Sequence, residues 1–141
     1  MTQLLFLFIS LFSISTFSTP DDGDQILGTW VNKEQTTHVE IYKKDGRYYG
    51  KIAWLPRTVD QDGNPITDRN NPDEELRDRE LLGADILEGF EYEEGEWKGG
   101  TLYSPQNGQK VSPTLQINSD GELNMKVKKG LMKRTVTWTR L

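Results

Sequence analysis

The chain has 141 residues, no cysteine, one histidine and a formal net charge of −5. This length accommodates one domain with a removable leader, and the acidic balance argues against a nucleic acid as partner. Without cysteine there are no disulfides, thiolate metal sites or cysteine nucleophiles, and the single His38 excludes sites that need two histidines of this chain. We therefore expect neither a metal nor a cofactor.

The N-terminal residues have the pattern of a secretory signal peptide. Residues 1–18 carry no charged side chain, and their apolar run, residues 4–17, is too short to span a membrane as a helix. The small residues Thr16 and Ser18 precede the expected cleavage point, and an acidic stretch follows it. We expect a periplasmic or secreted protein that is not an integral membrane protein after signal removal. An uncleaved amphiphilic anchor is the alternative.

From residue 19 onward, short alternating segments are separated by turn residues. Segments typical of strands are residues 26–32, 37–43, 48–55, 84–92, 97–103, 111–117, 122–128 and 132–140. Most are joined by turns of hairpin length, of which Asp45-Gly46 is the clearest. The sequence predicts an all-β fold over residues 19–141, an antiparallel meander of about eight strands that closes as a single barrel. In residues 48–55 both faces carry large apolar groups, so alternation leaves the inward face open.

Residues 56–80 interrupt the strand pattern with three prolines and many Asp and Asn side chains. A loop of this length in a small domain is usually functional or mobile. Its end favours a short helix with Asn71 as N-cap and Pro72 in the first position. The run from Asp60 resembles a calcium-binding loop, but Pro65 stands where that loop needs glycine, and Asn71 where it needs glutamate. We expect an Asx-rich structural loop, with calcium binding as the alternative.

Charge is shared unevenly along the chain. Residues 19–97 carry 9 basic and 20 acidic side chains, whereas residues 98–141 carry 8 basic and 2 acidic ones. Neighbouring strands with opposite charges on the outer surface explain this asymmetry. The alternative is a basic face that meets an anionic component of the cell envelope.

The candidate ligand-binding residues are polar or aromatic and lie on predicted strands or in the long loop. Glu40 stands between two apolar strand residues; an inward Glu40 needs a partner such as Arg77, Arg79 or Arg140, and an outward Glu40 is solvated. Strand aromatics either fill the core or line a cup for a hydrophobic or sugar-like ligand. The candidates are Glu40, Tyr42, Tyr49, Trp54, Asp68, Asn71, Arg77, Arg79 and Tyr103.

Ordered stretches along the whole mature chain carry a resemblance to a known family. They include Ile26-Leu27-Gly28-Thr29-Trp30, Tyr49-Gly50-Lys51-Ile52-Ala53-Trp54-Leu55, Asp68-Arg69-Asn70-Asn71-Pro72-Asp73, Tyr103-Ser104-Pro105-Gln106-Asn107-Gly108 and Arg134-Thr135-Val136-Thr137-Trp138. In these stretches the chain resembles the bacterial family catalogued as domain of unknown function 2147, small exported proteins. The resemblance implies fold and compartment, and no established activity. One departure is Lys128-Lys129-Gly130-Leu131-Met132-Lys133, where the family tends to have an Arg-Gly-aromatic turn.

A second resemblance concerns how the barrel closes. Gly28-Thr29-Trp30 near the start and Arg140 near the end are similar to the Gly-x-Trp and terminal Arg of lipocalin- and avidin-type barrels. The resemblance implies that Arg140 covers Trp30 beside the junction of the first and last strands, where a guanidinium stacks well on an indole. Trp138 shares its strand parity with Arg140. The expected closure residues are Gly28, Trp30, Trp138 and Arg140.

Three functions fit these observations. The leading hypothesis is an exported, non-catalytic barrel that binds an unknown small molecule or envelope component at one end, with residues 56–80 as a lid. The second is an enzyme that acts on envelope carbohydrate or lipid through Glu40 and Asp68. The third is a structural or interaction protein that uses its basic C-terminal half. A hollow barrel favours the first, paired buried carboxylates the second, and a filled barrel with an exposed apolar patch the third.

Overall fold

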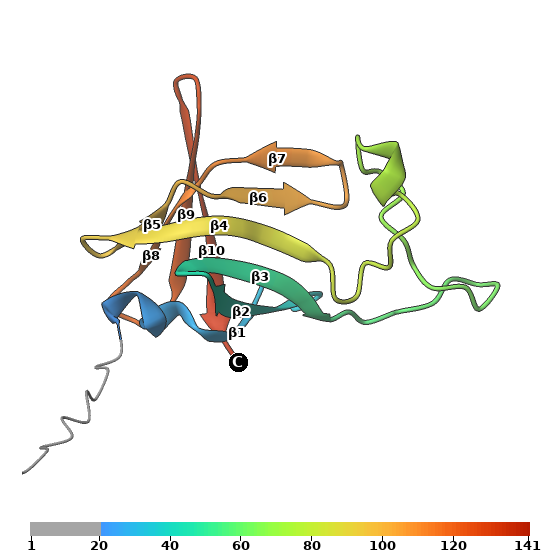
Figure 1. The fold of residues 1–141 in the computed structure, drawn as a ribbon, viewed down its shortest axis with the longest axis horizontal. Helices are drawn as coiled ribbons and strands as arrows, with labels where there is room; N and C mark the ends of the chain where they lie inside the picture. Colours follow the sequence, from blue (N-terminus) through green and yellow to red (C-terminus); the bar gives the residue numbers. More distant parts are fainter. Residues whose placement is uncertain (1–20) are drawn as a thin grey trace, which may run out of the picture.

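A computed structural model describes residues 21–141 of the chain, so the expected signal peptide, residues 1–18, lies outside the described residues. In this range the regular secondary structure is β-strands, apart from two short 3-10 helices (Figure 1). The elements in order are η1 (Asp22–Ile26), β1 (Gly28–Val31), β2 (His38–Lys44), β3 (Arg47–Trp54), η2 (Glu74–Leu76), β4 (Asp85–Glu93), β5 (Glu96–Lys98), β6 (Thr101–Ser104), β7 (Gln109–Val111), β8 (Thr114–Ile117), β9 (Leu123–Lys129) and β10 (Met132–Arg140). No helix of the described range is long and apolar enough to cross a membrane.

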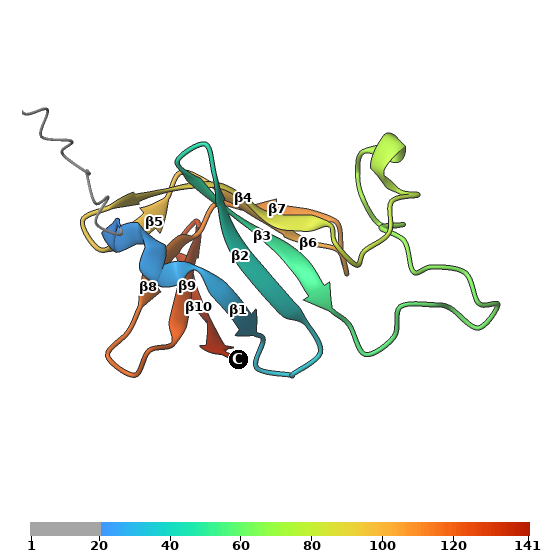
Figure 2. The ribbon, with the colours of Figure 1, turned by 60° about the horizontal axis from the view of Figure 1, so that its bottom comes forward.

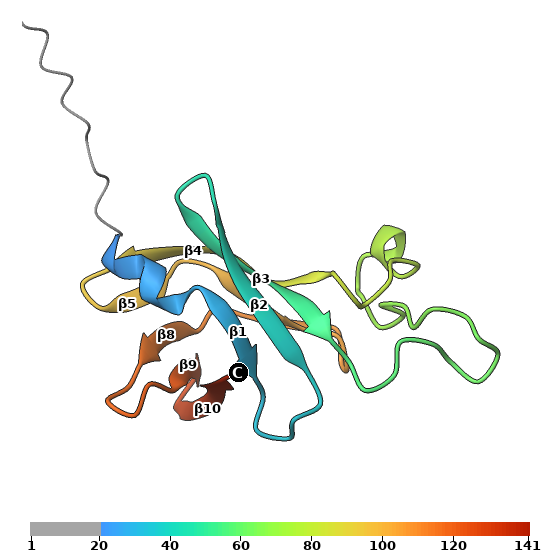
Figure 3. The same ribbon diagram turned by 90° about the horizontal axis from the view of Figure 1, so that it is seen from below.

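Eight of these strands close an antiparallel barrel. Their order around the wall is β3-β2-β1-β10-β9-β8-β5-β4, and β4 pairs back onto β3. The first and last strands lie side by side in Figures 2 and 3, with Trp30 opposite Arg140 and Val31 opposite Thr139. The prediction of a closed all-β barrel with one long loop is confirmed.

Two of the expected strands are each divided into two. The predicted strand 97–103 becomes β5 and β6, because Gly99 has a φ of +81° and a Cβ at Gly100 would stand 2.5 Å from a ring carbon of Phe90. The predicted strand 111–117 becomes the end of β7 and all of β8, separated by Pro113, which has no N–H to donate. After these breaks, β6 and β7 form a hairpin that extends beside the long loop (Figure 1).

One end of the barrel is filled by large side chains. Trp30, Phe90, Leu115 and Leu123 are each 1% exposed or less. Helix η1 lies across this end, where the completely buried Ile26 packs into the core (Figure 2). The indoles of the core also fasten η1: Trp30 Nε1 donates to the carbonyl oxygen of Ile26 over 2.8 Å, and Trp97 Nε1 to that of Gly23 over 3.1 Å.

Arg140 joins the last strand to the segment before the first. Its guanidinium carbon lies 4.2 Å from the ring centroid of Trp30, and its nitrogens donate to the carbonyl oxygens of Leu27 at 2.8 Å and Gln25 at 2.6 Å. Gly28 has a φ of +123°, and an added Cβ would stand 3.1 Å from Arg140 Nη1. Glycine here therefore meets both a conformational and a steric requirement.

The pairing of β3 with its neighbours determines which face of residues 48–55 points into the barrel. Tyr48, Gly50 and Ile52 are buried in the barrel, and Tyr49 and Lys51 are on the outer face. A register shift between His38 and Val39 then pairs His38 with Trp54. The two rings lie 4.6 Å apart between centroids, and Trp54 is 43% exposed. The bulge thus carries Trp54 to the outer face.

The long loop differs from its predicted form at the helix start. The N-cap is Asp73, whose carboxylate accepts from the Glu75 N–H, and not Asn71. Asn71 is buried, its Oδ1 accepts from the Asp73 N–H, and its Nδ2 donates to Asp68. The carboxamide is therefore occupied in holding the loop, and only the single turn Glu74–Leu76 follows.

Candidate functional site

The barrel is hollow at the end opposite η1. A cavity of about 670 Å³ opens there between the β1–β2 loop, the start of β4 and the β6–β7 turn. Its apolar wall consists of Ile52, Leu55, Ile66, Leu81, Ile86, Leu102, Val136 and Trp138. The cause is side-chain volume, because all of these lining groups except Trp138 are aliphatic and of moderate size, whereas Trp30, Trp97 and Phe90 fill the closed end.

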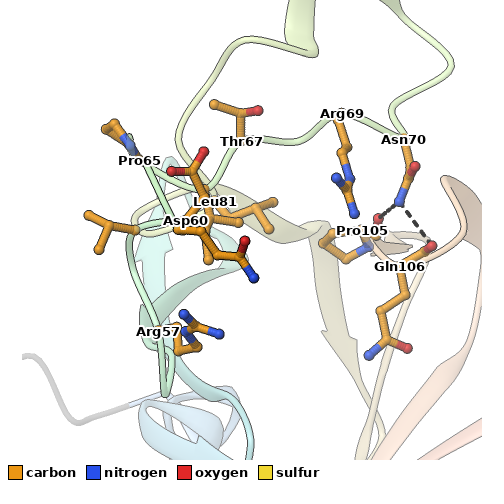
Figure 4. A pocket seen from close by; sticks show the side chains of 12 residues that line it. Arg57, Asp60, Pro65, Thr67, Arg69, Asn70, Leu81, Pro105 and Gln106 are labelled. Carbon is orange, nitrogen blue, oxygen red and sulfur yellow. Dashed lines mark hydrogen bonds between the residues drawn. The ribbon is translucent and has the colours of Figure 1, made fainter. Parts of the chain in front are cut away.

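A smaller adjoining pocket of about 430 Å³ lies between the long loop and the β6–β7 turn (Figure 4). The two spaces share the lining residues Arg57, Ile66, Leu81, Pro105 and Gln106, so the loop forms a wall between them. The Asn70 carboxamide donates to the carbonyl oxygens of Pro105 at 3.1 Å and Gln106 at 3.0 Å, the dashed lines of Figure 4. These bonds hold the loop against the rim of the cavity.

A buried carboxylate ties the long loop to strand β6. Asp68 is 1% exposed; its Oδ1 accepts from the Tyr103 hydroxyl at 2.6 Å, and its Oδ2 accepts from Asn71 Nδ2 at 2.8 Å and Arg79 Nε at 3.0 Å. Burial and the bond to Asp68 raise the pKa of Tyr103 to about 12. The hydroxyl of Tyr103 therefore remains a hydrogen-bond donor to Asp68 well above the pH at which an exposed tyrosine ionises.

Five of the nine candidate residues meet in this network. Besides Asp68, Asn71, Arg79 and Tyr103, it includes Arg77, whose Nε donates to the carbonyl oxygen of Asn71 over 2.8 Å. Of the five, Tyr103 also lines the barrel cavity. The network anchors the loop, and its polar atoms are turned toward one another.

The other four candidates lie on the outer face of β2 and β3. Glu40 is exposed, with Lys51 Nζ at 4.0 Å and none of the three expected arginines beside it. Tyr42 and Tyr49 stack with centroids 5.8 Å apart. The Tyr42 hydroxyl donates to Asp85 over 2.6 Å, and burial together with this bond raises the pKa of Tyr42. With Trp54 on His38, these side chains form an external stripe separate from the cavity.

Sequence reasoning did not select the apolar lining or two arginines of the rim. Val136 and Arg134 share strand parity with the buried Trp138, so alternation along β10 carried a signal for both. Arg57 follows β3 directly and had no comparable signal. Within residues 21–141, neither Arg57 nor Arg134 has a carboxylate oxygen within 4.0 Å.

Asp60, the first residue of the calcium-like run, has structural partners within the loop. Asp60 Oδ1 accepts from the N–H groups of Asp62 and Asn64, each over 2.9 Å, which closes an Asx-type turn. In the described part of the chain, no three His, Asp or Glu side chains are grouped closely enough to hold a metal ion. Asp68 is the one fully buried carboxylate in this range. Glu40, the other candidate acid, is exposed on the outer face of the barrel.

Comparisons with known proteins agree with this geometry. Protein HP1028 from Helicobacter pylori, described as belonging to the lipocalin family, has a similar structure with a TM-score of 0.67 and 27% identity. The match covers 82% of this chain and 82% of that one. No curated protein sequence matches the chain. The lipocalin-family neighbour confirms the second resemblance noted in the sequence. The bacterial family described as "Uncharacterized protein conserved in bacteria (DUF2147)" matches residues 28–140, which confirms the first resemblance, and the chain belongs to this family.

Proposed function

We propose that this protein is an exported, non-catalytic barrel that binds a small, mainly apolar molecule at its open end, with residues 56–80 as a lid. The observation that carries the proposal is the cavity of about 670 Å³ in a barrel whose other end is filled. Ligand pockets have volumes of this order, and eight-stranded barrels of the lipocalin type hold one small ligand. The likeness to a lipocalin-family structure supports the same function.

The lining favours an elongated ligand with an acidic head. Ile86, Leu102 and Val136 offer only apolar contacts, which suits a hydrocarbon body. Arg57 and Arg134 lie on the lining without a carboxylate partner in the described residues, and a guanidinium binds a carboxylate or phosphate through two parallel hydrogen bonds. We expect the head at these arginines and the body deeper in the barrel.

The occupied state of Asp68 supports binding rather than catalysis. Both of its oxygens accept hydrogen bonds from neighbouring side chains, and the residue is 1% exposed, so the carboxylate is not open to the cavity. Glu40, its partner in the enzymatic hypothesis, lies on the outer face of β2 beside Lys51. A carboxylate pair on either side of a reacting bond is therefore not assembled by these two residues.

A matched pair of substitutions on β10 tests the proposal. Val136→Trp fills the cavity, whereas Thr135→Trp places the same indole on the exposed outer side of the strand. We expect the neutral fluorophore N-phenyl-1-naphthylamine to brighten on binding the wild-type protein and the Thr135→Trp variant. Val136→Trp should weaken its affinity at least about tenfold by occupying the apolar volume. Equal affinities for the two variants would contradict the proposal.

The acidic head is tested with a second probe, 11-(dansylamino)undecanoic acid. Arg134→Gln should weaken binding of this carboxylate about tenfold, the size of one charge-assisted hydrogen bond. The same variant should bind the neutral naphthylamine as the wild type does. If both probes lose affinity equally, the arginine shapes the cavity and does not recognise a head group.

A further inference from the structure

The β9–β10 hairpin projects beyond the barrel wall and differs from the rest of the surface (Figure 1). Residues 126–134, which form its outer half, contain five basic side chains and no acidic one. Leu131 is 104% exposed and Met132 78% exposed, the highest values among large apolar residues of the described range. An apolar tip is thus surrounded by positive charge.

The turn itself makes the tip apolar. Lys129 pairs with Met132, so Gly130 and Leu131 are the two turn residues, and Gly130 has a φ of +62° as the first position of such a turn requires. Turns in water usually carry Asn, Asp, Ser or Gly at such positions. Here the second position is Leu131, whose side chain is fully exposed. Burying it against a partner would release free energy in proportion to its whole apolar area.

The charges behind the tip are not compensated within the described chain. Lys128 lies directly opposite Lys133 across the strand pair, and like charges in this arrangement destabilise a hairpin. No carboxylate oxygen of residues 21–141 lies within 4.0 Å of either lysine. Lys126 joins them along a groove in which Glu96 is the one acidic side chain. An external anion would remove this repulsion.

We propose that this hairpin docks the protein onto an anionic bilayer surface, with Leu131 and Met132 entering the headgroup region and the lysines contacting lipid phosphates. An apolar tip flanked by cations with long aliphatic stems is the chemistry of the bilayer interface. A soluble polyanion would use the lysines and leave the tip in water. Single-stranded nucleic acids are bound by aromatic stacking platforms, and the hairpin carries no aromatic residue in residues 126–134.

Charge distribution also sets the orientation. Residues 21–97 have a net charge of −11, from 9 basic and 20 acidic side chains, so this part of the barrel is repelled by an anionic surface. Residues 98–141 have a net charge of +6 and include the hairpin. The protein therefore approaches with the hairpin first. Because Arg134 and Val136 line the cavity, docking brings its mouth toward the lipid, a consequence that rests on the proposed function, whereas docking itself does not.

A single fluorescent label tests the docking. The chain has no cysteine, so Leu131→Cys can be labelled uniquely with an NBD fluorophore. Ser119→Cys, in the exposed turn at the other end of β9, is the matched control. The tip label should shift to the blue with phosphatidylcholine vesicles that contain about 30% phosphatidylglycerol, and this shift should fall as salt is raised. The control label should not respond. All variants share the same leader, so its apolar run cannot produce the difference.

Removing the opposed lysines separates docking from folding. Lys128→Gln and Lys133→Gln should each weaken vesicle binding by about fivefold. The melting temperature should stay equal or rise, because the cross-strand repulsion is relieved. Val136→Trp should still dock, which distinguishes failure of docking from failure of cavity binding. The proposal is overturned if the tip label stays unchanged on anionic vesicles, responds equally to pure phosphatidylcholine, or responds only to soluble heparin.

Discussion

Asp68 joins two stretches of the long loop to strand β6 through one buried carboxylate. Three different donor groups bind its two oxygens: the amide of Asn71, the guanidinium of Arg79 and the hydroxyl of Tyr103. A carboxylate that is 1% exposed costs free energy unless its charge and lone pairs are met. The network therefore specifies one arrangement of the loop as well as contributing to stability.

Asp68→Asn tests this role. The neutral amide loses the ion pair with Arg79 and places an NH₂ group where two donors converge, so we expect the free energy of unfolding to fall by about 2–4 kcal/mol. Tyr103→Phe should cost about 1–2 kcal/mol, because only one bond is lost. Urea denaturation measures both. Asp62→Asn in the exposed turn is the control and should change stability by less than about 0.5 kcal/mol; an equal loss in Asp62→Asn and Asp68→Asn would contradict the account.

The buried tyrosines predict a loss of stability at high pH. The pKa values of Tyr48 and Tyr103 are raised to about 12 by burial and by their bonds to Asp24 and Asp68. The unfolded chain releases these protons near pH 10 while the folded one still holds them, so the free energy of unfolding falls as pH rises from about 10 to about 12. Tyr103→Phe should make this decline shallower. Identical slopes for the variant and the wild type would show that Tyr103 titrates alike in both states.

Single-residue orientation was the least predictable level of this structure. The sequence shows aromatic groups on both sides of residues 48–55, and the inward side depends on the register with β2. One bulge beside His38 then reverses the direction of Trp54. The sequence could predict the four candidates of the long loop, because polar side chains concentrated in one loop need partners. They are Asp68, Asn71, Arg77 and Arg79. Binding by Glu40, Tyr42, Tyr49 and Trp54, which lie outside the cavity, stays a prediction of the sequence that competes with binding in the open end.

At the scale of elements, the contact between β1 and β10 decides whether the sheet is a barrel. Arg140→Ala removes a guanidinium 4.2 Å from the Trp30 centroid and leaves two carbonyl oxygens without their donors, at a cost of about 1–3 kcal/mol. Trp30→Ala opens a cavity in the closed end and should cost about 3–5 kcal/mol. In urea denaturation the double variant should lose less than the sum, since contacting residues couple. Strict additivity would contradict the closure contact.

The strands were predictable as segments but not as an unbroken set. Alternation and turn residues located all eight segments of the wall, because half-buried strands impose a period of two. The division at Gly99-Gly100 depends on a close approach to Phe90, which is visible only when the neighbouring strand is placed. The division at Pro113 follows from its missing N–H, a signal that the sequence already carries. The helix N-cap is Asp73 and not Asn71 for a local reason, since the Asn71 carboxamide is already bonded to Asp68 and to the Asp73 N–H.

For the whole molecule, the sequence predicts closure and leaves the hollow end undetermined. Closure follows from strand number and the Trp30–Arg140 pair, whereas the cavity depends on which side chains share a layer of the barrel. Large residues such as Phe90 and Trp97 meet at one end, and moderate ones such as Ile52 and Val136 at the other. Large and moderate side chains are both apolar, so a pattern of polar and apolar residues does not distinguish the filled end from the hollow one.

Export of the whole molecule is predicted from its N-terminal residues. If residues 1–18 are a signal peptide, protein recovered from its native cells should have an intact mass that corresponds to a start at Thr19. Fractionation should place that species outside the cytoplasm. A variant in which both Leu7 and Phe8 are replaced by arginine should remain at full length, because the apolar run is interrupted. Recovery of the full-length wild-type chain in the membrane fraction would favour the uncleaved anchor.

Amide chemical-shift mapping by NMR during titration with 11-(dansylamino)undecanoic acid tests the central claim most directly. Binding in the open end predicts the largest shifts at Ile52, Ile86, Leu102 and Val136, with little change at Phe90 and Leu115 in the filled end. Saturable shifts confined to Tyr42 and Tyr49 would place the ligand on the outer face of the barrel. That result, or no saturable shift at all, would contradict the account.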